Sequence, residues 1–135
     1  MKIYVDGGSR GNPGPAAVGV VAFDETHHEL HRYGASIGVR TNNYAEYSAL
    51  IEALTYLESK KISKSATIYS DSELVVRQMN GEYKVKDDKL KALHEKARNL
   101  TDRIGTVRIR HIRRSENHIA DLIVNRVLDN IPITD

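Results

Sequence analysis

The chain has 135 residues, with 20 Lys and Arg against 18 Asp and Glu and no cysteine. This length fits one domain over residues 1–135, and the lack of cysteine excludes disulfides, zinc thiolate sites and thiol nucleophiles. No apolar run approaches the roughly 18 residues that span a bilayer, and the N-terminal MKIYVDGG lacks the apolar stretch of a signal peptide. We therefore expect a cytoplasmic protein with no membrane partner.

Apolar periodicity predicts an alternation of strands and helices along the chain. Polar or glycine-rich stretches separate the periodic segments and supply turns and helix caps. The predicted elements in chain order are strands at 2–6, 16–23 and 30–39, a helix from an N-cap at Asn43 to Leu57, a polar connector at 63–65, a strand at 66–70, helices at 72–79 and from near Asp87 to Gly105, a strand at 106–112 and a helix at 119–128.

The connections between these elements predict how the strands are arranged. Parallel strands joined through helices require right-handed crossovers, which put the first, fourth and fifth strands side by side. The second and third strands then continue as an antiparallel meander beyond the first strand. The expected fold class is α/β, with a five-stranded mixed sheet in the order 3-2-1-4-5 flanked by helices.

Four acidic residues stand out by their positions. Asp6 and Asp71 each close a predicted strand, whereas Glu46 and Asp121 open helical patterns after polar connectors. The carboxyl ends of neighbouring parallel strands lie on one rim of a sheet, so all four side chains can meet there. Taken singly, such an acid is more often a solvated helix or strand cap. Taken together, four carboxylates repel unless cations neutralise them, which predicts Mg²⁺-dependent phosphate chemistry.

Four sequence blocks that cover nearly the whole chain resemble the successive motifs of ribonuclease HI, the type 1 ribonuclease H family. The blocks are YVDGGSRGNPGP, TNNYAEYSALIEAL, YSDSELVVRQMNGEYKVK and HIRRSENHIADLIVNRVL. The resemblance implies a ribonuclease H-like fold and an endoribonuclease that cuts the RNA strand of RNA–DNA hybrids, leaving 5′-phosphate and 3′-hydroxyl ends. It also implies that Asp6, Glu46, Asp71 and Asp121 bind two Mg²⁺ or Mn²⁺ ions.

Two polar segments have alternative interpretations. The glycine-rich residues 7–15 form either a simple turn or a side-chain-free surface that lets the RNA strand approach Asp6. Residues 41–43 either cap the following helix or offer hydroxyl, amide and N–H groups to a phosphate. The residues expected to contact the hybrid are Gly7, Gly8, Ser9, Arg10, Gly11, Asn12, Thr41, Asn42, Asn43, Ser72 and Glu73.

The chain departs from the better-known bacterial pattern in three ways. Residues 79–86 lead straight into the next helix, without the basic, Trp-bearing helix of many relatives, which resembles the compact archaeal-type form. Glu73 replaces the usual Gln, and no flexible glycine loop follows His111. We expect His111 to be a partly buried strand residue and Arg114 to be the catalytic group near the leaving phosphate.

Other functions share this architecture, because fold alone does not fix the substrate. A nuclease for double-stranded RNA or DNA junctions, and a nucleic-acid binding module with weak catalysis, remain alternatives. Met1 directly before the first strand favours a free-standing protein over a domain of a reverse transcriptase. A monomer is the default expectation.

Overall fold

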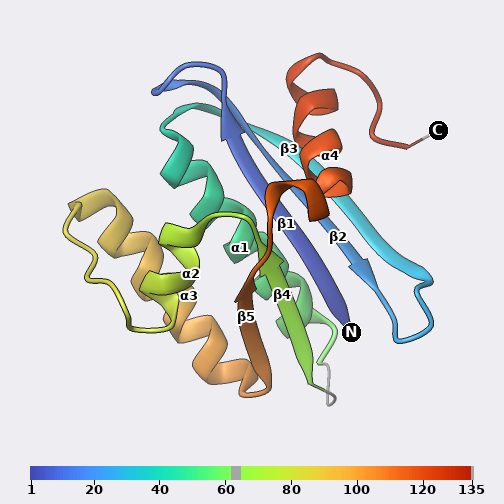
Figure 1. Cartoon of the computed structure of the whole chain (residues 1–135), viewed down its shortest axis with the longest axis vertical. Coiled ribbons are helices and arrows are strands. Elements are labelled where there is room, and N and C mark those ends of the chain that lie inside the picture. The colour runs from blue at the N-terminus through green and yellow to red at the C-terminus, as the bar shows by residue number, and fades with distance from the viewer. Residues whose placement is uncertain (62–64, 135) are drawn as a thin grey trace.

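A computed structural model describes residues 1–61 and 65–134. Most of the connector predicted at 63–65 therefore lies outside the described residues. The elements, which follow the predicted order (Figure 1), are β1 Lys2–Ser9, β2 Gly14–Phe23, β3 Glu29–Arg40, α1 Asn42–Ser59, β4 Ala66–Ser70, α2 Glu73–Met79, α3 Asp88–Ile104, β5 Val107–His111, the 3₁₀ helix η1 Arg114–Glu116 and α4 His118–Leu128.

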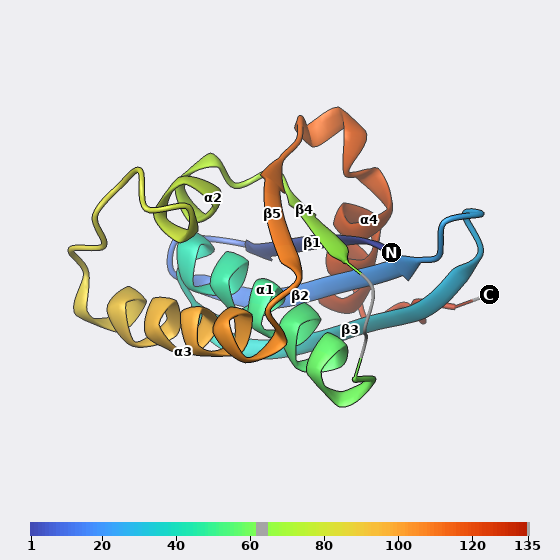
Figure 2. The ribbon, with the colours of Figure 1, turned by 90° about the horizontal axis from the view of Figure 1, so that it is seen from below.

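The strands form one mixed sheet in the order β3-β2-β1-β4-β5, which confirms the predicted topology. β1 pairs antiparallel with β2 and parallel with β4, and β4 pairs parallel with β5. Helix α1 covers one face of the sheet, with α3 beside it, and α4 covers the other face over β1 to β3 (Figures 1 and 2). The strand β1 is therefore central and covered by helices on both faces.

Two glycines allow α1 and α4 to approach the sheet closely. A Cβ atom on Gly7 would lie 2.1 Å from the backbone oxygen of Ala45 in α1. On the opposite face, a Cβ atom on Gly19 would lie 2.6 Å from the backbone oxygen of Ala120 in α4. Both distances are far below van der Waals contact, so these positions require glycine.

The main core lies between the sheet and helices α1 and α3. It is built from alternate apolar residues of the central strands, such as Ile3, Val5 and Ile68, and from the apolar side of α1. Tyr47 is fully buried in this core, and its hydroxyl donates a 2.6 Å hydrogen bond to Oε1 of Gln78 in α2. This bond satisfies two polar groups that burial would otherwise leave unpaired.

Three local predictions are corrected by the structure. β1 continues past Asp6 to Ser9, because residues 7–9 keep their antiparallel pairing with residues 16–18. The predicted turn therefore shrinks to four residues, 10–13. The N-cap of α1 is Thr41 rather than Asn43, since the Thr41 hydroxyl accepts a 3.2 Å hydrogen bond from the Tyr44 backbone N–H.

Candidate active site

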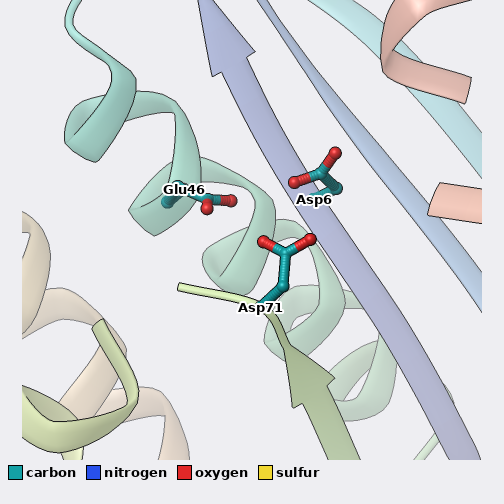
Figure 3. A group of neighbouring side chains, drawn as sticks. All are labelled: Asp6, Glu46 and Asp71. Atoms are coloured by element: carbon teal, nitrogen blue, oxygen red, sulfur yellow. The ribbon is translucent and has the colours of Figure 1, made fainter. Parts of the chain in front are cut away.

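Three carboxylates from three different elements meet at the rim of the sheet (Figure 3). Asp6 comes from β1, Glu46 from α1, and Asp71 directly follows β4. Each of them offers an oxygen atom that lies within 4.8 Å of those of the other two. The Glu46 carboxylate accepts a 2.7 Å hydrogen bond from the Gly7 backbone N–H, which fixes it against β1.

The fourth predicted acid lies beside this triad. Asp121 is in the first turn of α4, and its carboxylate lies close enough to Asp6 to contribute, after burial and Asp71, to the raised pKa of Asp6. Its Oδ1 lies 3.9 Å from Nη2 of Arg114, whose side chain is 84% exposed and therefore stays accessible to a ligand. The structure thus brings together all four acids and Arg114.

Burial makes this cluster electrostatically unfavourable when it is fully ionised. Asp6 and Glu46 are each only 6% exposed. Desolvation, followed by the charges of Asp71 and Asp121, raises the pKa of Asp6 from 3.8 to about 8. Desolvation, followed by the charges of Asp6 and Asp71, also holds the pKa of Glu46 well above its usual value. Such shifts are typical of functional sites.

The donor set fits a hard divalent cation. All the clustered ligand atoms are carboxylate oxygens, which Mg²⁺ and Mn²⁺ prefer. A cation would also offset the repulsion that raises the pKa values of Asp6 and Glu46, by favouring their ionised forms. The triad and Asp121 are therefore the residues that would hold metal ions.

The acids open into a cleft of about 460 Å³ that also contains most of the residues predicted to bind substrate. The cleft is lined by the four acids, by Arg114 and by Gly7, Gly8, Ser9, Arg10, Asn42, Ser72, Glu73, Leu74, Val124, Asn125 and Leu128. Asn12, Thr41 and Asn43 instead line a neighbouring depression. The Asn12 side-chain oxygen accepts a 2.9 Å hydrogen bond from the Asn42 backbone N–H, which links the two. Gly11 borders neither of them.

Several of these side chains already have partners within the protein. The Ser72 hydroxyl caps α2 by accepting from Val75. Glu73 is ion-paired with Arg77 at 3.1 Å. The Arg10 guanidinium is ion-paired with Asp129, at the end of α4. A substrate contact by these three residues stays a prediction.

His111 differs from the sequence prediction. It is exposed at the end of β5 rather than partly buried, because β5 is the edge strand and only Ile109 in it is buried. It borders a separate groove between β5, α2 and α3 rather than the acidic cleft.

Sequence reasoning missed Asn117, which lies at the start of α4 and is 1% exposed. Its Nδ2 donates to the Val5 backbone oxygen at 2.8 Å and to Oδ2 of Asp71 at 3.3 Å. Its backbone oxygen accepts from the Asp121 N–H at 3.1 Å. Asn117 therefore connects β1, Asp71 and the helix that carries Asp121. The only sequence signal was its position four residues before Asp121, which a helix cap also explains.

Comparisons with known proteins agree with this geometry. A family model described as reverse transcriptase-like matches residues 4–127. The crystal structure of LC11-RNase H1 in complex with RNA/DNA hybrid is similar to the chain, with 44% identity, 96% coverage of each chain and a TM-score of 0.91. The chain is also 39% identical over 130 residues to a ribonuclease HI of Halobacterium salinarum, covering 96% of this chain and 65% of that relative.

A third relative is much longer than this chain. The bifunctional protein Rv2228c of Mycobacterium tuberculosis is 38% identical over 133 residues, which cover 96% of this chain and 36% of that protein. The chain thus spans between about a third and two thirds of the length of these two curated relatives. Among the described residues, no helix combines the length and apolar character needed to cross a membrane.

Proposed function

We propose, since this chain belongs to the reverse transcriptase-like family and within it to the type 1 ribonucleases H, that it is an endoribonuclease that hydrolyses the RNA strand of RNA–DNA hybrids. The observation that carries the proposal is the meeting of Asp6, Glu46 and Asp71, joined by Asp121, in one open cleft. The structure of LC11-RNase H1 with RNA/DNA hybrid supports the choice of substrate.

The family depends on divalent metal ions, and we propose that the four acids hold two Mg²⁺ or Mn²⁺ ions. Metal ions in such a site lower the pKa of a water nucleophile and stabilise charge on phosphate oxygens. The protein residues hold the site in shape before substrate arrives. The Gly7 N–H orients Glu46, Asn117 orients Asp71, and β1 carries Asp6 between its two paired neighbours β2 and β4.

In the proposed reaction, the oxygen of a water molecule forms a bond to phosphorus and the bond from phosphorus to the ribose 3′ oxygen breaks. The attacking water gives up a proton to solvent and the leaving 3′ oxygen takes up a proton from solvent, so the products carry 5′-phosphate and 3′-hydroxyl ends. We assign Arg114 the role of offering positive charge to the phosphate, because its exposed guanidinium lies beside Asp121 at the cleft.

Recognition of RNA rather than DNA requires contact with the 2′-hydroxyl, which both donates and accepts hydrogen bonds. The cleft offers such groups on Asn42, Ser72 and Glu73, next to the backbone of residues 7–9. We propose that these groups read the RNA strand. Thr41 and Asn43, in the adjoining depression, would then bind a phosphate near the start of α1.

The test is cleavage of end-labelled RNA–DNA hybrid, RNA duplex and DNA duplex in Mg²⁺, Mn²⁺ or EDTA. Wild type is compared with Asp71→Asn and with Glu95→Gln, a matched loss of an exposed carboxylate on α3. We expect metal-dependent cutting of the hybrid's RNA strand by wild type and Glu95→Gln only. No cutting by folded wild type in either metal would refute the proposal in favour of a binding module.

The finer parts of the proposal are tested by further measurements. Comparison of the two metals measures the cofactor preference, and the RNA duplex tests whether double-stranded RNA is a second substrate. Light scattering of the active protein tests our proposal of a monomer, and a single cooperative unfolding transition would support our proposal of one domain. Cell fractionation tests a cytoplasmic location.

A further inference from the structure

A second groove runs along the edge strand β5, separate from the acidic cleft. Its volume is about 730 Å³, and its lining residues come from β5, from Tyr69 of β4, from the end of α2 and from the second half of α3. Figure 2 shows how the ribbons of these elements are arranged. We call it the β5 groove. Its polar lining includes Tyr69, Asn80, Arg98, Arg108, Arg110 and His111.

The β5 groove is basic. It contains three arginines and a histidine against one carboxylate, Asp102. No residue in the described part of the chain forms an ion pair with Arg108 or Arg110, although both are exposed. By contrast, Arg77 and Arg103 on α2 and α3 are each paired with a glutamate. Adjacent guanidinium groups without carboxylate partners favour a ligand with phosphate groups.

The β5 groove also leads toward the acidic cluster. Tyr69 of β4 is in register with Arg110, and Ser70 is in register with His111. The Ile112 N–H then donates a 3.0 Å hydrogen bond to the Ser70 oxygen, one residue before Asp71. A chain lying along β5 would therefore reach the cleft at Asp71.

We propose that the β5 groove binds an unpaired nucleic-acid strand that extends from the hybrid held in the acidic cleft, an inference that rests on the proposed function for its duplex part. Arg108 and Arg110, which alternate with the buried Ile109 and therefore share a face of the sheet with Tyr69, would contact phosphates, and the ring of Tyr69 would contact a base. Tyr69 stacks on Tyr4 with ring centroids 5.1 Å apart, which holds its ring in place. Aromatic rings beside a cationic groove are typical of single-strand binding.

The length of β5 limits the strength of this binding. Its five residues span about 13–16 Å, which is short beside dedicated single-strand binding folds. We therefore expect weak, salt-sensitive binding of a single strand alone. The larger effect should be a gain in affinity for hybrids that carry an unpaired extension, because the β5 groove and the acidic cleft then bind two parts of the same molecule.

The test uses the double variant Arg108→Gln/Arg110→Gln. The control is the double variant Lys60→Gln/Lys96→Gln, which removes the same charge at positions outside both the groove and the cleft. Fluorescence anisotropy in EDTA measures binding of a single-stranded DNA 15-mer and of polyglutamate. Cleavage assays compare blunt hybrid with hybrids that carry a single-stranded extension at either end. Thermal melts check that both variants fold.

We expect the arginine variant to bind the 15-mer about fivefold more weakly than the control, because two phosphate contacts are lost. It should also lose the advantage of extended over blunt hybrid while cutting blunt hybrid like wild type. Equal binding by the two variants, or binding of polyglutamate but not DNA, would overturn the inference. Failure of wild type to cut blunt hybrid would count against the proposed function instead, since the 15-mer assay does not depend on cleavage.

Discussion

Replacing Asp6 by Asn should stabilise the metal-free protein even though it removes a proposed metal ligand. Burial, followed by the charges of Asp71 and Asp121, raises the pKa of Asp6 from 3.8 to about 8. Between these values the native state binds more protons than the unfolded state, so the free energy of unfolding falls as the pH rises. Asparagine has nearly the same shape as aspartate but carries no ionisable carboxyl group. The variant therefore lacks this pH-dependent loss of stability.

The magnitude follows from the pKa of Asp6. One pKa unit corresponds to about 1.4 kcal/mol, so raising the pKa of Asp6 from 3.8 to about 8 destabilises the native state at pH 7 by at most ~4 kcal/mol. Desolvation, followed by the charges of Asp6 and Asp71, also raises the pKa of Glu46, so the protonation of Glu46 changes when Asp6 is replaced. We therefore expect a gain in unfolding free energy of about 1–3 kcal/mol at pH 7.

Urea unfolding in EDTA between pH 5 and pH 8, followed by circular dichroism, measures this gain. It should grow with pH and be near zero for Glu95→Gln. Adding Mg²⁺ should stabilise wild type more than the variant, since a ligand that binds only the native state stabilises it. A folded Asp6→Asn protein no more stable than wild type at pH 7 in EDTA would refute the reasoning, as would a gain that is the same at every pH.

Three further perturbations test the site. Gly7→Ala should lower the free energy of unfolding by ~3 kcal/mol or more in thermal or urea unfolding, because the added Cβ would collide with the backbone of Ala45. The control Gly8→Ala, whose Cβ would lie 3.4 Å from Val124, should change the free energy of unfolding by less than about 1 kcal/mol. Asn117→Ala should cost about 2–3 kcal/mol and weaken Mg²⁺ binding in calorimetry, because it removes the buried hydrogen bond to the Val5 carbonyl oxygen and the hydrogen bond to Asp71. Unchanged metal affinity would contradict its positioning role. Metal binding at about pH 6–7 should release protons, because the raised pKa values of Asp6 and Glu46 keep protons on these two groups until a cation displaces them. The release is detected as a dependence of the apparent binding enthalpy on the buffer, and no dependence would refute protonation of the free site.

The arrangement of the four acids could be predicted because it depends mainly on topology. Asp6 and Asp71 follow directly after Val5 and Ser70, the last paired residues of the parallel strands β1 and β4, so the sheet order alone brings them together. Asn117 could not be predicted in the same way. Its partner Val5 lies 112 residues away in the sequence, and no periodic pattern marks a side chain that bonds a strand carbonyl. Such a role becomes visible only when the distance between the two elements is known.

The errors at the ends of elements have a common physical cause. Glycines and polar residues at 7–9 are typical of a turn, but backbone pairing with β2 costs them little and continues to Ser9. The apolar alternation through His111 predicted burial, but a strand at the edge of a sheet has a partner on one side only. The end of β1 and the exposure of His111 therefore depend on whether a neighbouring strand is present, rather than on the local residue pattern.

The close packing of α1 on β1 explains how the protein keeps repelling carboxylates together. A flexible scaffold would let the acids move apart and would lose the geometry that a cation needs. Because Gly7 has no side chain, α1 approaches β1 closely enough for the Gly7 N–H to bond Glu46 at 2.7 Å. Burial, together with the repulsion from Asp71 and Asp121, therefore holds the pKa of Asp6 at about 8 in the folded protein. Part of the free energy of metal binding is then the relief of this repulsion, so a variant that loosens α1 should lose metal affinity before it loses its fold.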